Sequence, residues 1–153
     1  MNHALNLPAD SAAPSPAASL TRPAPYVLSV VRIVAGLLFF EHGLSKLFGF
    51  PSAQMLPPAF TLEWFAGIIE FGGGGLTALG LFTRTAAFIA SGEMAIGYFL
   101  FHAPHGFYPY LNHGELAIMY CFFFFYLVFA GPGPLSLDAL LRLTLFERQN
   151  DRA

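Results

Sequence analysis

Four apolar stretches, each long enough to cross a lipid bilayer as a helix, constrain this chain more than any other feature of its sequence. An α-helix needs about 20 residues to span ~30 Å of hydrocarbon. Only 10% of the residues are charged, whereas a soluble domain carries about 25%. The connections are short, so consecutive helices lie antiparallel and adjacent, which predicts an all-α integral membrane protein with a four-helix bundle. The stretches cover residues 26 to 48, 61 to 82, 84 to 102 and 113 to 131.

The remaining residues divide the chain into three parts. Residues 1 to 25 are rich in alanine, proline and serine and show no apolar period, which is typical of a disordered tail. Residues 26 to 131 form the predicted transmembrane domain, and residues 132 to 153 form a cytoplasmic C-terminal segment. Leucines recur in that segment at helical spacing, at positions 137, 140, 141 and 145. They predict a short amphipathic helix on the membrane surface, with a frayed tail as the alternative.

The basic residues predict the orientation of the helices. Six arginines lie near the end that holds both termini and the connection between the second and third stretches, whereas the other end holds Lys46. An excess of Lys and Arg marks the cytoplasmic side of a membrane protein. Both termini are therefore expected in the cytoplasm, and Arg84, in the tight turn between the second and third stretches, is expected to anchor this topology.

Charge and cysteine content exclude several functions. The net charge of −2, without a basic cluster, argues against a nucleic-acid partner. The single cysteine, Cys121, excludes a disulfide framework, a cysteine-rich metal site and a C-x-x-C thiol relay, each of which needs at least two cysteines. His102 and His105 lack the short spacing of metal ligands on one helix, so no metal centre is expected.

Small residues line one face of each of the first three predicted helices. At 3.6 residues per turn, one or two glycines in each helix share a face with the buried charges of that helix. Such stripes allow transmembrane helices to approach closely. The glycines expected to form these packing faces are Gly36, Gly43, Gly67, Gly74 and Gly97.

Charged residues inside these stretches need compensation. A charge at the centre of a transmembrane helix costs about 2.5 to 3.5 kcal/mol on the insertion scale, and each Leu, Ile or Phe returns only about 0.3 to 0.6 kcal/mol. With a rise of ~1.5 Å per residue, Arg32, Glu93 and Glu70 lie within reach of one another. We therefore expect Arg32 to form an intramembrane ion pair with Glu93 or Glu70.

Other ionisable residues gather in the outer half of the predicted bundle. His42, Lys46, Glu70 and Glu115 are the candidates for a pocket that binds a ligand or handles protons. Three interpretations stay open at this point: such a pocket, a metal or haem site built from histidines, and a purely structural polar network.

Four ordered motifs resemble a known family. They are "RIVAGLLFFEHGLSKLFGF" in the first stretch, "EFGGGGLTALGLFTRTAA" across the second and third, "GELAIMY" at the start of the fourth, and "GPGPLSLD" after it. Over residues 26 to 138 the chain resembles the DoxX family of small four-helix membrane proteins. The resemblance implies a multi-pass protein of the bacterial inner membrane. In some members it also implies an association with quinone-linked oxidation of sulfur compounds, or with an oxidoreductase complex that protects against oxidative stress.

The leading functional hypothesis is a subunit or partner of a membrane redox system, with quinone as the cofactor that the resemblance suggests. The expected partners are the lipid bilayer, an oxidoreductase subunit and further copies of the chain. An autonomous enzyme is not expected, because the sequence has no paired cysteines, no recognisable pair of haem ligands and no nucleotide fold. Two alternatives stay open: a transport component for a small solute or protons, and a membrane scaffold or assembly protein.

Overall fold

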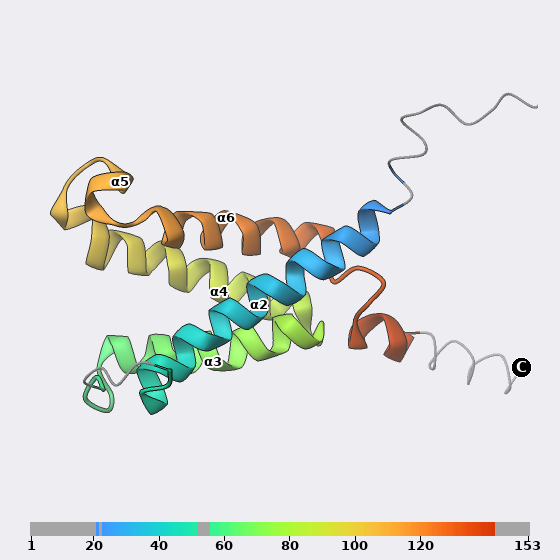
Figure 1. Cartoon of the computed structure of the whole chain (residues 1–153), viewed down its shortest axis with the longest axis horizontal. Helices are drawn as coiled ribbons and strands as arrows, with labels where there is room; N and C mark the ends of the chain where they lie inside the picture. Colours follow the sequence, from blue (N-terminus) through green and yellow to red (C-terminus); the bar gives the residue numbers. More distant parts are fainter. Residues whose placement is uncertain (1–20, 22, 52–55, 143–153) are drawn as a thin grey trace, which may run out of the picture.

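The computed structural model describes residues 21, 23–51 and 56–142, and within these ranges every regular element is a helix (Figure 1). The long helices are α2 (Ala24–Phe48), α3 (Leu62–Leu79), α4 (Thr83–Gly97) and α6 (Glu115–Ala130). A π-helical turn η1 (Tyr98–His102), a 3₁₀ turn η2 (Ala103–His105) and the short α5 (Pro109–Asn112) connect α4 to α6. The all-α fold class is confirmed.

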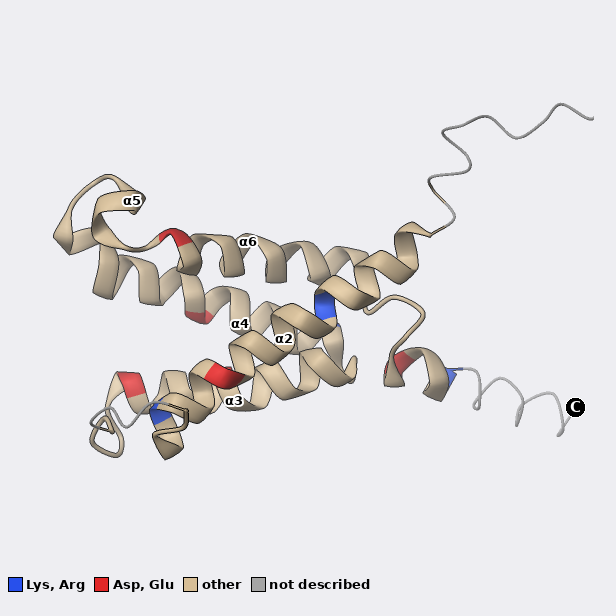
Figure 2. Cartoon of the chain, viewed as in Figure 1, with Lys and Arg blue, Asp and Glu red and all other residues tan. Residues whose placement is uncertain are grey.

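Two of the helical stretches have the length and composition of membrane-spanning helices. The stretches Ala24–Phe48 and Thr83–His105 are long and apolar enough to cross a bilayer, and Glu115–Ala130 is a shorter apolar helix. Large apolar side chains such as Val34, Phe88 and Phe122 are half or more exposed. Figure 2 shows how few charged residues interrupt the long helices. An apolar surface of this extent belongs against lipid or another protein.

Local sequence signals set the helix ends. The first long helix, α2, begins two residues before the predicted stretch, with Pro25 in its first turn, where the missing N–H is no loss. It ends at Gly49, whose φ of 69° suits glycine and whose N–H donates to the Ser45 carbonyl. Residues 137–142 are helical, as predicted for the start of the amphipathic segment. Its continuation beyond 142 and most of the predicted N-terminal tail lie outside the described residues.

Helices α2 and α3 form a pair in direct backbone contact. A Cβ atom added at Gly36 would lie 2.5 Å from the backbone nitrogen of Ala78. One added at Gly43 or Gly74 would overlap backbone atoms of the facing helix. Since only glycine fits at these three positions, the two backbones can lie as close as small-residue stripes allow.

Helices α4 and α6 form the second pair, through small residues. Three alanines of α4 are buried, and the Ser91 hydroxyl donates to the Cys121 carbonyl of α6 at 2.9 Å. Gly97, which the sequence placed on a packing face, has ordinary room, because a Cβ there would have Glu93 Oε1 at 3.9 Å as its nearest neighbour.

Aromatic side chains join the two pairs. The ring of Phe39 on α2 packs edge-on against Phe124 of α6 with 4.7 Å between centroids, and lies 5.4 Å from the ring of Tyr120. Phe39, Phe124 and Leu127 are completely buried. This core fills the space between the pairs midway along α2 and α6.

Arg32 closes one end of the molecule. Its side chain is completely buried and donates to four carbonyl oxygens: Pro132 at 2.8 Å, Ala78 at 2.9 Å, Leu135 at 2.5 Å, and Thr77. Two of these carbonyls end α3, where a helix leaves its last carbonyls without partners. The planar guanidinium carries five N–H donors and the positive charge that suits a helix C-terminus.

The ion pair predicted for Arg32 is therefore wrong. Neither Glu70 nor Glu93 is among its hydrogen-bond partners, and the ion pair that the described residues form is between Lys46 and Glu70. The estimate from helical rise neglected the carbonyls at the end of α3, which lie beside Arg32. The completely buried core around Phe39 separates Arg32 from the cavity that Glu70 lines.

Two further helix ends at the same end of the molecule are capped by ionic side chains. The carboxylate of Asp138 accepts the N–H groups of Phe82 at 2.9 Å and Thr83 at 3.0 Å, at the start of α4. Arg84 donates to the carbonyls of Phe129, at 2.9 Å, and Val128, at the end of α6. An anion at an N-terminus and a cation at a C-terminus are both favourable. We call this region, with Arg32, the capped end.

Candidate functional site

A polar cavity of about 230 Å³ lies between the two helix pairs, away from the capped end. In Figure 1 the pairs converge at the capped end and diverge toward α5. Side chains from α2, α3, α4, η1 and α6 meet at the cavity, together with His113 directly after α5. Its ionisable lining residues are His42, Lys46, Glu70, His102, His113 and Tyr120.

Lys46 and Glu70 form the electrostatic centre of this cavity. Lys46 Nζ lies 2.6 Å from Glu70 Oε1, and the Glu70 side chain is only 3% exposed against 34% for Lys46. The pair forms because α2 and α3 touch at Gly67, where an added Cβ would meet Lys46 Cβ at 3.0 Å. The second carboxylate oxygen, Glu70 Oε2, is buried without a hydrogen-bond partner. A buried carboxylate oxygen of this kind is costly unless a proton or a ligand satisfies it.

His102 is held in one tautomer. Its Nδ1 lies 3.0 Å from the Asn112 carbonyl, and since a carbonyl oxygen only accepts, Nδ1 carries the hydrogen. In the neutral ring with this tautomer, the other nitrogen, Nε2, has the lone pair. Asn112 is itself fixed, because its amide donates to the Gly106 carbonyl at 2.8 Å and its oxygen accepts the N–H of Gly114. The π-helical turn η1 brings His102 to this position, and such turns often occur at functional sites.

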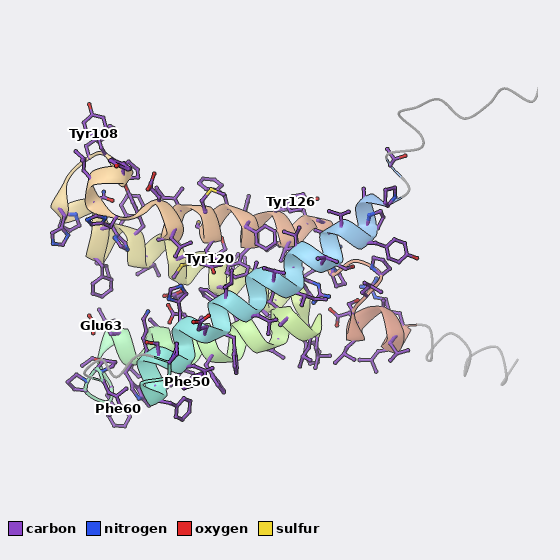
Figure 3. The ribbon with its side chains drawn as sticks, in the orientation of Figure 1. Phe50, Phe60, Glu63, Tyr108, Tyr120 and Tyr126 are labelled. Atoms are coloured by element: carbon purple, nitrogen blue, oxygen red, sulfur yellow. The ribbon has the colours of Figure 1, made fainter. Side chains whose placement is uncertain are left out.

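His42 and Tyr120 form the side of the cavity between α2 and α6. Their rings are perpendicular, with centroids 6.2 Å apart. Figure 3 shows Tyr120 where α6 faces α2. The same two residues also line a neighbouring cavity of about 410 Å³ that includes Glu41 and Ser45. The polar space therefore continues past His42 toward the end of α2.

Glu93 lies on the other side of Lys46. Both residues line an adjoining cavity of about 260 Å³, which Glu63 and His102 also reach. Glu93 interacts electrostatically with Glu70 and Lys46, and its Oε2 is buried without a hydrogen-bond partner. The two carboxylates thus have one ammonium ion nearby, and that ion is paired with Glu70. Their excess negative charge favours binding of a proton or of a hydrogen-bond donor.

The structure brings together three of the four residues predicted for a ligand or proton pocket. His42, Lys46 and Glu70 line the cavity, whereas Glu115 has an exposed side chain in the first turn of α6 and lies outside the lining. Among the described residues, no three His, Cys, Asp or Glu side chains gather in a way suited to a metal ion.

Sequence reasoning missed the contributions of His102, His113 and Tyr120 to this cavity. Tyr120 stands within the run "IMYCFFFFYLVFA", where one aromatic residue cannot be told from its neighbours by pattern. His102 reaches the cavity through a π-helical turn that no sequence signal marks.

Comparisons with known proteins identify one family and two relatives of the chain. The sequence model of the DoxX family matches residues 27–103, just over half of the chain. The chain is 44% identical over 123 residues to an uncharacterized protein of Haemophilus influenzae, covering 74% of this chain and 90% of the relative. It is 34% identical over 119 residues to the inner membrane protein YqjF of Escherichia coli, covering 73% and 89%. No solved structure matches the chain significantly.

Proposed function

Because the chain belongs to the DoxX family of membrane proteins, we propose that it binds a quinone head group in the polar cavity, as a subunit or partner of a redox system of the bacterial inner membrane. In this proposal all four long helices cross the membrane and both termini are cytoplasmic. The capped end then lies at the cytoplasmic side, and the polar cavity lies in the outer half of the bilayer.

The observation that carries the proposal is the chemistry of the cavity lining. A quinone presents two carbonyl oxygens that accept hydrogen bonds, and its reduced form presents two hydroxyls that donate them. Lys46 Nζ can donate to a carbonyl oxygen, and Glu70 Oε2, which has no hydrogen-bond partner, can accept from a hydroxyl. In its neutral form His102 offers a second acceptor at Nε2. Each redox state of the ligand thus finds complementary groups.

The residues of this chain bind the head group and exchange protons with it. Lys46 and Glu70 share one short ion pair, so a proton taken up by Glu70 or released by Lys46 alters the charge seen by the ligand. Electron transfer is assigned to an oxidoreductase partner. This division agrees with the expectation that the chain does not act as an autonomous enzyme.

A binding role is favoured over a transport path by the position of the polar groups. The cavities that contain Lys46, Glu70 and Glu93 lie toward the diverging end. Between them and Arg32 stands the completely buried core around Phe39 and Phe124. A path for protons or solute through the described helices would need this core to open. Flux measured in proteoliposomes tests the transport alternative.

The proposal is tested by native mass spectrometry of the protein taken from its own membrane in mild detergent. We expect a bound quinone in the wild-type protein and in Glu115→Gln, which alters an exposed carboxylate outside the cavity. Glu70→Gln should reduce the retained quinone by at least about tenfold, because a hydrogen bond to a charged group contributes about 1.5 to 3 kcal/mol. Gel filtration checks that both variants remain folded.

Two results would contradict the proposal. One is a wild-type protein without bound quinone that also fails to take up added quinone. The other is an equal occupancy in Glu70→Gln and Glu115→Gln. A stoichiometric oxidoreductase subunit in the same spectra would support the assignment of a redox partner, whereas a stable partner of another kind would favour a scaffold.

A further inference from the structure

An apolar groove leaves the polar cavity between α2 and α6. The groove has a volume of about 390 Å³ and is lined by residues such as Val30, Val34 and Leu38 of α2 and Phe123 of α6. Leu116 and Tyr120 line both the groove and the polar cavity. The two spaces therefore meet at a shared wall, polar on one side and apolar on the other.

Of the two apolar grooves, the one between α2 and α6 opens directly from the polar cavity. Glycine backbones close the contact between α2 and α3, and a hydrogen bond from Ser91 to Cys121 joins α4 to α6. A second apolar groove, also about 390 Å³, runs between α3 and α4. It shares no lining residue with the polar cavity itself and reaches that cavity through the adjoining one, with which it shares Ala66, Glu93 and Gly97. Aromatic side chains, and not backbone contacts, hold α2 to α6 at Phe39. Side chains can change rotamer more easily than backbones can move, so this contact can admit a ligand from the bilayer to the cavity.

We propose that the ligand of the polar cavity is a membrane amphiphile, whose apolar chain lies in the groove between α2 and α6 and which enters from the bilayer between these helices. This inference rests on the proposed function, to which it adds the chemical class and the route of the ligand. From Val30 to Leu38 the groove is eight residues long, or ~12 Å along α2. A chain of about that length fits beside the helix while the head group contacts Lys46 and Glu70.

The groove orients the ligand and gives it access to the cavity, but adds little hydrophobic affinity. A chain that moves from lipid to the groove exchanges one apolar surrounding for another, so it gains little from the hydrophobic effect. A bulky residue that fills the groove should therefore lower the affinity of a ligand with an apolar chain, because the chain no longer fits. It should not change the affinity of a ligand without such a chain. This difference separates the groove from the head-group site.

The test compares two benzoquinone probes in protein embedded in lipid nanodiscs. One is ubiquinone-0, which has no chain, and the other is decylubiquinone, which carries a ten-carbon chain. Val34→Trp places a large side chain in the groove between α2 and α6. Ile89→Trp is the matched control in the groove between α3 and α4, because Val34 and Ile89 are both β-branched and are 51% and 50% exposed. Met119→Trp, from the α6 side of the same groove, guards against an effect peculiar to one variant.

We expect Val34→Trp and Met119→Trp to weaken decylubiquinone binding by about tenfold or more and ubiquinone-0 binding by less than about twofold. Ile89→Trp should leave both affinities unchanged. Undiminished binding of decylubiquinone in both groove variants would overturn the inference and leave the proposed function standing, with bilayer lipid as the occupant of the groove. An equal loss of both probes, or the same loss in Ile89→Trp, would also overturn it. Failure of both probes to bind the wild-type protein would overturn the proposed function itself.

Discussion

Asp138 joins the segment after α6 to the start of α4. Burial alone would raise the pKa of its carboxyl, but hydrogen bonds from Thr83 and Phe82, together with the charge of Arg142, hold that pKa below its ordinary value. A carboxyl whose pKa is lowered by folding stabilises the folded state above the pKa of the unfolded chain. This stabilisation is lost as the pH falls through the folded-state pKa.

For this reason Asp138→Asn should lower the melting temperature of the detergent-solubilised protein at neutral pH. The difference from wild type should persist down to about pH 4 and shrink below it, because the wild-type carboxyl is then protonated as well. Thermal unfolding followed by circular dichroism across this range measures it. If the difference in melting temperature stayed constant to the lowest pH, the shape of the Asp138 side chain and not its charge would account for the stabilisation.

Arg32 gives a second prediction at the residue scale. Its replacement by Met removes the charged donor from the carbonyls of Ala78, Pro132 and Leu135, and leaves the Thr77 carbonyl with the N–H of Gly80 alone. We expect a loss of about 3 kcal/mol or more, on the scale of several hydrogen bonds to a charged group. Arg32→Lys should recover only part of this, since an ammonium lacks the planar fork of donors.

The exposed Arg142 offers the control for these variants. Unfolding in mixed detergent and dodecyl sulfate should place Arg142→Met within about 0.5 kcal/mol of wild type, as for an ordinary surface substitution. A stability of Arg32→Lys equal to that of wild type would mean that the charge alone suffices and that the fork geometry does not contribute.

Arg32 also shows which contacts could not be predicted from the sequence. The apolar stretches and glycine periods predicted which helices exist, because these depend on local spacing. The positions of the ionisable residues also predicted that Lys46, Glu70 and His42 line one pocket. The partner of Arg32 depended on Pro132 and Leu135, about 100 residues away along the chain and recognised through their backbone carbonyls. Side-chain patterns carry no information on such backbone contacts.

At the scale of helices, the pair of α2 and α3 depends on backbone contact. Gly43→Ala would bring a Cβ onto the backbone of Phe71, which cannot move without moving α3. We expect this variant to lose about 1 to 3 kcal/mol, as for an overpacked interface. Because Lys46 and Glu70 lie one helical turn along the same contact, quinone binding should weaken as well.

Gly92→Ala is the control for this prediction. Gly92 also lies inside a long helix, but no atom stands within 4 Å of an added Cβ there. Alanine should therefore be neutral or stabilising by up to about 1 kcal/mol, because it favours helix more than glycine does. Equal stabilities for the two alanine variants would show that the close approach of α2 and α3 does not contribute to the stability of the fold.

At the scale of the whole molecule, the orientation in the membrane can be tested by cysteine labelling. In a Cys121→Ala background, His105→Cys should react with a membrane-impermeant maleimide added to intact spheroplasts. Arg142→Cys should react only after the membrane is permeabilised, because the arginine-rich end is expected in the cytoplasm. His105 and Arg142 are both exposed and lie at opposite ends of the long helices. The reverse labelling pattern would move the polar cavity to the cytoplasmic half.

The capped end also has a consequence for biogenesis. Arg32 enters the membrane with the first helix, yet two of its four acceptors, Pro132 and Leu135, leave the ribosome about 100 residues later. Asp138, which caps the start of α4, is also synthesised after every long helix. Until then Arg32 lacks those two partners and α4 lacks its cap. The chain completes its packing only when translation has nearly ended, so a nascent chain truncated before residue 132 would expose an incompletely satisfied arginine to the cell's membrane quality control.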